Sequence, residues 1–123
     1  MMRVLIADDD ADLRDLVSIA VEKAGYEVAA AVGDGLSAWD ALQAEDIDLA
    51  VLDISMPGLT GLELVQRIRG DAQLREQHVL IITANAQPST AEAVHLAGAN
   101  GLITKPFQVR ELVEFMRGVA DRV

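Results

Sequence analysis

Apolar residues along the chain gather in short runs that are separated by amphipathic segments. Three of these runs are nearly continuous, which is typical of strands covered on both faces of a parallel sheet. Strands that alternate with helical patterns favour an α/β fold with crossover helices on both faces of the sheet. The pattern therefore predicts a doubly wound five-stranded parallel sheet. Its strands are Arg3–Ala7, Glu27–Val32, Asp48–Asp53, Val79–Thr83 and Gly101–Thr104.

Three of the intervening segments repeat apolar residues at helical spacing, so one face of each is predicted to pack on the sheet. Gly25 and Gly98 stand where the first and fourth helices need a left-handed residue to end. The apolar positions are Leu13, Leu16, Val17, Ala20 and Val21, then Leu62, Val65 and Ile68, then Val109, Leu112, Val113 and Met116.

Length and composition predict one globular domain over residues 1–123. The chain is 51% hydrophobic, and a domain of this size buries about two-thirds of the surface of its unfolded chain. It has no cysteine, which excludes disulfides and thiolate metal sites. No apolar stretch approaches the length of a membrane span, and Met1–Ile6 runs into acidic residues without forming a signal peptide. We therefore expect a cytoplasmic protein without membrane contact.

The net charge of −10 is concentrated in the first half of the chain. Residues 1–53 hold 13 acidic and 3 basic residues, whereas residues 54–123 hold 7 of each. Such a domain is repelled by phosphate backbones, so we expect no direct contact with nucleic acid. Any control of DNA would act through another polypeptide.

Polar residues follow four of the predicted strands. Asp8 and Asp9 follow the first strand, Asp53 ends the third, Thr83 ends the fourth and Lys105 follows the fifth. In an open parallel sheet, the carboxyl ends of the strands line one crevice at which ligands bind. Side chains that are far apart in sequence are therefore predicted to meet there.

Crowded acids at strand ends indicate a cation. Two carboxylates ~4 Å apart repel by roughly 4 kcal/mol at an effective dielectric near 20, whereas a helix N-terminus returns only about 0.3 to 1 kcal/mol. Carboxylate oxygens with no His or Cys nearby in sequence favour Mg²⁺ over zinc or copper. Asp10 is interpreted as a helix N-cap, and Asp12 and Asp15 as first-turn residues with no part in metal binding.

The motifs at these positions resemble the receiver domains of two-component response regulators, the CheY-like superfamily. The resemblance covers the whole chain in the right order and implies a flavodoxin-like strand order of 2-1-3-4-5. Four segments must coincide for it to hold: Ala7-Asp8-Asp9-Asp10, Leu52-Asp53-Ile54-Ser55-Met56-Pro57-Gly58, Ile82-Thr83-Ala84 and Thr104-Lys105-Pro106-Phe107.

The resemblance implies a role for each site residue. Asp53 would accept a phosphoryl group from a phosphohistidine, and Asp8 and Asp9 would hold Mg²⁺, with Asp9 as the direct ligand and Asp8 acting through water. The backbone carbonyl of Ser55 would complete the coordination by the protein. The resemblance also implies a cis peptide bond between Lys105 and Pro106.

Elementary chemistry agrees with these roles. A carboxylate that attacks phosphorus needs cations to neutralise the phosphoryl oxygens. Lys105 supplies a compact charge that can follow a moving oxygen, which suits a switch better than the rigid fork of Arg. Because Arg outnumbers Lys eight to two in this chain, a Lys at this position is informative. Thr83 offers a hydroxyl to a phosphoryl oxygen, and the small Ala84 leaves room for the group to enter.

As a receiver, the domain would act as a phosphorylation-controlled switch that catalyses only its own phosphorylation and dephosphorylation. Its partners would be a sensor histidine kinase or histidine phosphotransfer protein, and a downstream output domain or target protein; a phosphorylation-dependent dimer is left open. Leu102 stands where many receivers carry an aromatic residue that turns inward when the Thr moves toward the phosphoryl group. Because Leu102 is aliphatic, we expect the signal to travel mainly through residues 85–89 and the fourth helix.

Three other functions are open to the same fold. A phosphohydrolase of the dehalogenase type needs a second Asp two residues after its nucleophile, where this chain has Ser55. A flavin or nucleotide module needs a glycine-rich first turn, whereas this turn is rich in Asp. A pseudo-receiver that only scaffolds partners would lack part of the reaction set, and here no member is missing.

Overall fold

The computed structural model describes residues 1–122 and confirms the predicted alternation of strands and helices. Every predicted strand is present, and only the first residues of the third and fourth differ from the prediction, each by one position. In chain order the elements are β1 (Arg3–Ala7), α1 (Ala11–Lys23), β2 (Glu27–Val32), α2 (Gly35–Ala44), β3 (Leu49–Asp53), α3 (Gly61–Gly70), β4 (His78–Thr83), α4 (Pro88–Ala97), β5 (Gly101–Thr104) and α5 (Val109–Ala120).

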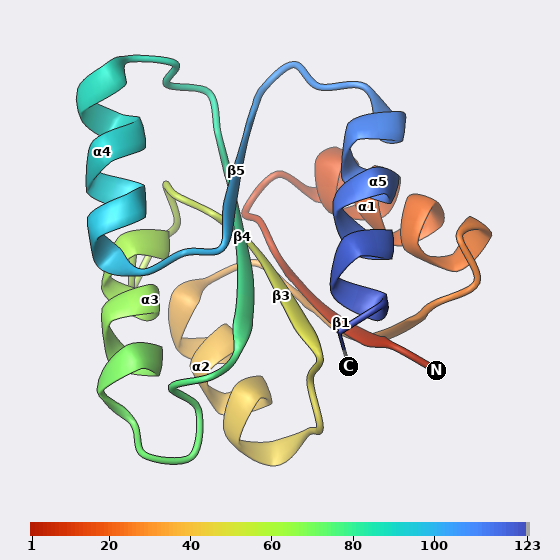
Figure 1. The fold of residues 1–123 in the computed structure, drawn as a ribbon, viewed down its shortest axis with the longest axis horizontal. Helices are drawn as coiled ribbons and strands as arrows, with labels where there is room; N and C mark the ends of the chain where they lie inside the picture. Colours follow the sequence, from red (N-terminus) through yellow and green to blue (C-terminus); the bar gives the residue numbers. More distant parts are fainter. Residues whose placement is uncertain (123) are drawn as a thin grey trace.

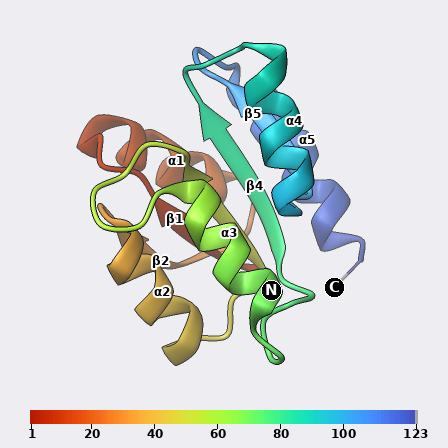
Figure 2. The same ribbon diagram turned by 90° about the vertical axis from the view of Figure 1, so that its left-hand side faces the viewer.

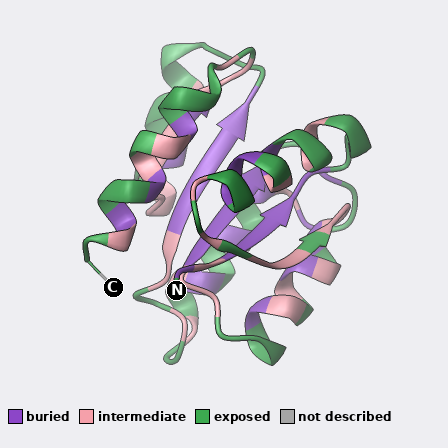
Figure 3. Cartoon of the chain, turned by 90° about the vertical axis from the view of Figure 1, so that its right-hand side faces the viewer, coloured by how far each residue is buried: buried purple, intermediate pink, exposed green. Residues whose placement is uncertain are grey.

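The strands form one parallel sheet in the order β2-β1-β3-β4-β5, as the resemblance implied. The three central strands are almost wholly buried, because helices cover them on both sides (Figure 3). The edge strands β2 and β5 are only partly covered. Because the strands are parallel, their carboxyl ends lie along the same edge of the sheet. The candidate site residues stand at these strand ends or directly after them.

Helices α1 and α5 cover one face of the sheet, and α2, α3 and α4 cover the other (Figure 1). The first layer buries Val17 and Val21 of α1 against Leu112 and Met116 of α5. The second layer is built around side chains such as Leu64 of α3. The central strands β1, β3 and β4 are therefore packed on both faces up to the strand ends that carry Asp8, Asp53 and Thr83.

Two predicted core positions face outward. Leu16 is 44% exposed and Val109 is 39% exposed, although both lie on the helical stripe read from the sequence. The contact between a helix and a sheet is narrower than this stripe, so residues at its margin remain in solvent. Both side chains line a shallow groove between α1 and α5.

The predicted helix ends are confirmed. Gly25 has φ of 92° and Gly98 has φ of 102°, a backbone region that favours glycine. Asp10 caps α1 by accepting hydrogen bonds from the backbone N–H groups of Asp12 and Leu13. Among the helices of residues 1–122, none has both the length and the apolar character that crossing a bilayer requires.

Candidate functional site

Three carboxylates converge where β1 and β3 end. Asp8 and Asp53 are buried and Asp9 is exposed, and each offers an oxygen within 4.8 Å of the others. The side chain of Asp8 is oriented by the N–H of Asp10, which donates to its Oδ1 at 2.9 Å. The backbone N–H of Asp8 also donates to the carbonyl of Val32, which continues the β1–β2 pairing into the site.

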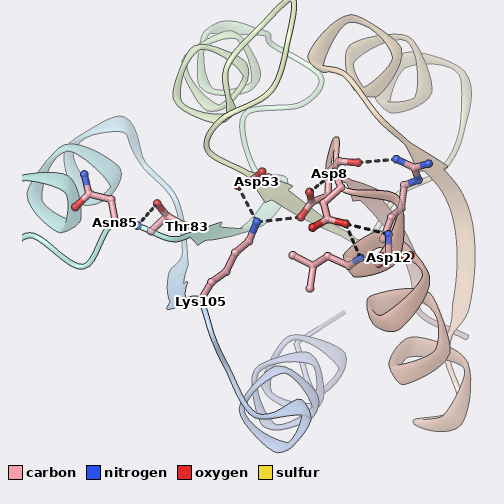
Figure 4. A network of polar contacts seen from close by, with 9 residues as sticks. Asp8, Asp12, Asp53, Thr83, Asn85 and Lys105 are labelled. Atoms are coloured by element: carbon pink, nitrogen blue, oxygen red, sulfur yellow. Dashed lines mark hydrogen bonds and ion pairs between the residues drawn. The ribbon is translucent and has the colours of Figure 1, made fainter.

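Lys105 reaches into this group from the end of β5. Its Nζ lies 3.3 Å from Oδ2 of Asp8 and 3.4 Å from Oδ1 of Asp53. Figure 4 shows the amine between the two carboxylates. The Lys105–Pro106 peptide bond is cis, as the resemblance implied. The chain thus brings together one cation and three anions from segments that are far apart in sequence.

The electrostatics of the site oppose the charged form of Asp53. Burial raises the pKa of the Asp53 carboxyl, and the neighbouring Asp8 carboxylate raises it further, while Lys105 lowers it. At 4.8 Å, a pair of like charges repels by about 3 to 4 kcal/mol at an effective dielectric near 20. One ammonium among three carboxylates leaves two negative charges, which is the amount that a divalent cation neutralises.

The donor set fits Mg²⁺. Carboxylate oxygens are hard ligands, and Mg²⁺ is held in proteins by a few of them together with water molecules. Asp9 is exposed and so leaves space for such waters, whereas the oxygens of Asp8 and Asp53 face inward. The sequence prediction that an acidic cluster forms here is confirmed.

Thr83 lies on the other side of the Lys105 amine from Asp8 (Figure 4). Its side chain is fully buried, and its Oγ1 accepts a hydrogen bond from the N–H of Asn85 at 3.0 Å. A hydroxyl that accepts in this way still has its own proton to donate. The hydroxyl therefore links the strand end to the loop that leads into α4.

A cleft of about 320 Å³ opens beside these groups, between the β3–α3 and β4–α4 loops. Ser55, Thr83, Ala84 and Asn85 are among the residues that line it. Ser55 is exposed, two residues beyond Asp53. Ala84, which is expected from the sequence to leave room for a phosphoryl group, is one of the lining residues.

Two residues that shape the site were missed by sequence reasoning. Arg14 donates from Nη1 to the backbone carbonyl of Asp8 at 2.7 Å and so holds the Asp8–Asp9 peptide in place. Gly61 starts α3 against the end of β3, and a Cβ there would lie 2.5 Å from the Asp53 carbonyl oxygen. Neither contact leaves a local signal, because both depend on which loops the fold brings together.

The family model for the response regulator receiver domain matches residues 4–117, and the acidic cluster and the lysine occupy the strand ends described above. The chain belongs to the response regulator receiver family. Its function is therefore that of a phosphorylation-dependent signalling switch in two-component systems, and neither a dehalogenase-type hydrolase nor an unphosphorylated scaffold is favoured.

Curated relatives agree with this assignment. The receiver is 35% identical to the chemotaxis protein CheY-3 of Vibrio cholerae, covering 99% of this chain and 94% of the relative. It is 33% identical to the chemotaxis protein CheY of Pseudomonas aeruginosa, covering 99% and 98%. It is also 38% identical to the DNA-binding dual master transcriptional regulator RpaA of Synechocystis, where 99% of this chain covers 50% of the relative.

Solved structures have the same fold. The chemotaxis response regulator CheY4 of Vibrio cholerae superposes with a TM-score of 0.89 at 33% identity, over 97% of this receiver and 98% of that chain. The signal receiver domain of a histidine kinase from Syntrophus aciditrophicus gives a TM-score of 0.92 at 25% identity, over 100% and 92%. Similar receivers therefore occur in proteins of different organisation.

Proposed function

We propose that Asp53 is the phosphoacceptor of this receiver. An oxygen of its carboxylate attacks the phosphorus of a phosphohistidine, the bond between phosphorus and the imidazole nitrogen breaks, and the imidazole leaves with the bonding electrons and takes up a proton. The observation that supports this role is the position of Asp53 at the end of β3, with Lys105 Nζ 3.4 Å from its Oδ1.

The surrounding residues would stabilise the transferred group. Lys105 would move its ammonium to a phosphoryl oxygen, which neutralises charge as it develops. Asp8, Asp9, Asp53 and the backbone carbonyl of Ser55 would hold Mg²⁺, with Asp8 acting through water. Mg²⁺ supplies positive charge to the phosphoryl oxygens when it is bound.

The switch would begin at Thr83. Its hydroxyl, which now accepts from Asn85, would donate to a phosphoryl oxygen and draw the β4–α4 loop toward Asp53. The face formed by α4, β5 and α5 would change as a result. We propose that residues 1–123 act as one such domain and are read by an output domain or a separate target protein, with dimerisation as one form of output.

The phosphodonor would be a sensor histidine kinase or a histidine phosphotransfer protein. We propose that the domain catalyses only its own phosphorylation and dephosphorylation and does not turn over other phosphate esters. The domain would not bind nucleic acid directly, because its net charge of −10 is repelled by phosphate backbones.

Mass spectrometry after incubation with acetyl phosphate and Mg²⁺ tests the proposal. The wild type should gain the mass of one phosphoryl group, and Asp53→Asn should gain none because an amide is a poor nucleophile. Asp12→Asn is the matched control, since Asp12 lies in the first turn of α1 outside the carboxylate cluster, and it should be modified like the wild type. A wild type that binds Mg²⁺ but stays unmodified would contradict the proposal.

A further inference from the structure

Helix α4 is attached unevenly to the rest of the domain. Val94, in its last turns, is the one residue of α4 that is buried, and most other side chains of the helix are exposed. The helix follows β4 and runs back along the sheet, so its N-terminal end lies at the site and its C-terminal end lies away from it (Figure 1). The two ends are held by different contacts.

Arg69 holds the C-terminal end. It lies in the last turn of α3, and helices α3 and α4 cover the same face of the sheet (Figure 2). Its Nε donates to the carbonyl of Gly98 at 2.9 Å, and its Nη2 donates to Oδ1 of Asn100 at 3.0 Å. The guanidinium thus ties the last turn of α3 to the end of α4 and to the loop that leads into β5.

The other half of the Arg69 fork fixes the guanidinium itself. Its Nη1 donates to the backbone carbonyls of Arg75 and Gln77, both at 2.7 Å, in the loop between α3 and β4. Within residues 1–122, Arg69 makes no ion pair, so these contacts depend on directed N–H groups rather than on an opposite charge. A planar fork of five donors suits this task, and a lysine ammonium does not.

The residues that Arg69 contacts are themselves fixed. Asn100 Oδ1 also accepts from the N–H of Val79 at 2.8 Å, and the N–H of Asn100 donates to the Val79 carbonyl at 2.8 Å. Gly98 has φ of 102°, and a Cβ on it would lie 3.1 Å from Arg69. The C-terminal end of α4 is therefore joined to the start of β4 by a continuous set of hydrogen bonds.

The N-terminal end of α4 has weaker support. Gln87 is its N-cap and makes no side-chain capping bond, and residues 84–87 are exposed. The N–H of Gln87 donates to Oδ1 of Asn85, and the N–H of Asn85 donates to Oγ1 of Thr83. Movement of the Thr83 hydroxyl would therefore be passed to this end of the helix.

We propose that Arg69 is a positioning residue of the switch: it holds α4 at Gly98 while the N-terminal end of the helix follows Thr83. Phosphorylation then turns α4 about its C-terminal end instead of shifting the whole helix. The inference rests on the proposed function, because the movement of Thr83 is assumed in it. It adds the fixed point that converts a small displacement near Asp53 into a change of helix orientation.

Amide chemical shifts measured before and after addition of Mg²⁺ and beryllium fluoride, which mimics the acyl phosphate, test this pivot. In the wild type, shift changes should be large for the amides of residues 83–87 and 89 and should fall to background for residues 98–101. Arg69→Met keeps the aliphatic stem but removes the fork, so changes should extend into residues 98–101. Arg69→Lys should behave like Arg69→Met, because it restores charge without the fork.

Arg67→Met is the matched control. Arg67 lies in the same turn of α3, but its guanidinium lies over the Trp39 ring, 5.8 Å from the ring centroid. This variant should keep the wild-type gradient of shift changes along α4. A merely structural role for Arg69 would lower the thermal stability of the variant and leave that gradient unchanged. Wild-type shift changes of equal size at both ends of α4 would overturn the pivot.

Hydrogen exchange tests the anchor in the unmodified protein. Arg69→Met should speed amide exchange of Val79 and residues 98–101 by about tenfold, as expected when one or two hydrogen bonds are lost, and should leave exchange of residues 83–87 and 89 unchanged. Unchanged exchange at residues 98–101 would overturn the anchor. A wild type that gains a phosphoryl group yet lacks the gradient overturns the pivot alone, whereas one that is neither modified nor perturbed overturns the proposed function as well.

Discussion

The acidic residues at the two ends of the sheet lie in different environments. At the amino end, Arg3 pairs with Glu27 at 2.7 Å and with Glu45 at 3.2 Å, and its backbone N–H donates to Asp48. Hydrogen bonds to these glutamates raise the pKa of Arg3. At the carboxyl end, three carboxylates share one lysine at 3.3 and 3.4 Å.

This difference separates charges that stabilise the fold from charges that the fold holds for another purpose. The amino-end glutamates are exposed, so water screens the negative charge that Arg3 does not pair. The carboxyl-end acids retain two uncompensated charges, and burial raises the pKa of Asp53. A cluster that opposes folding in this way is typical of a functional site.

Removing a cation from each end of the sheet should give the largest difference between the two ends. Lys105→Ala should leave modification by acetyl phosphate possible but reduce the shift of the Asn85 amide on modification, because no ammonium would hold the phosphoryl group where the Thr83 hydroxyl can reach it. Arg3→Ala should keep both modification and the shift. Mass spectrometry and amide spectra of the same samples provide the measurement, and a full Asn85 response in Lys105→Ala would contradict the proposed role.

Removing one acid from each end should give the next largest effect. Asp9→Ala should weaken Mg²⁺ binding at least about tenfold, as loss of metal-site residues commonly does. Glu45→Ala should leave Mg²⁺ affinity unchanged, since Glu45 pairs with Arg3. Titration calorimetry of both variants measures the difference, and equal affinities would show that the carboxylate cluster is not the Mg²⁺ site.

The smallest effect concerns stability and pH. Because the pKa of Asp53 is raised in the folded state, the folded protein binds this proton more tightly than the unfolded chain. In Mg²⁺-free solution, the contribution of Asp53 to the free energy of unfolding should fall as pH rises from about 3.9, the ordinary carboxyl value, through the raised folded pKa. Asp53→Asn should lack this fall, so its Tm should exceed that of the wild type increasingly toward neutral pH.

Glu27→Gln is the amino-end counterpart in that experiment. It breaks an exposed ion pair, whose loss costs at most about 1 kcal/mol, and it should lower the Tm slightly at neutral pH. Thermal unfolding followed by circular dichroism at mildly acidic and neutral pH compares the two. The interpretation of the carboxyl end is wrong if Asp53→Asn is less stable than the wild type at neutral pH without Mg²⁺.

Strand positions and the candidate site residues were accessible to sequence reasoning because each has a local signature. A buried strand needs an apolar run, and Asp8, Asp53, Thr83 and Lys105 stand directly at the ends of such runs. The outward position of Leu16 had no such signature. Helical spacing defines a stripe of apolar residues, but the width of the contact depends on how α1 and α5 share one face of the sheet.

The sequence alone was sufficient to predict the alternation of strands and helices and to indicate the family. It also predicted that acidic residues and a lysine meet at one edge of the sheet. These features were accessible because periodicity and strand ends are local properties of the sequence. Only the folded arrangement decided that Arg14 supports the Asp8 carbonyl and that Arg69 joins α3 to α4. Such contacts use backbone carbonyls, which every residue possesses, so nothing in the sequence distinguishes the carbonyl that will be bound.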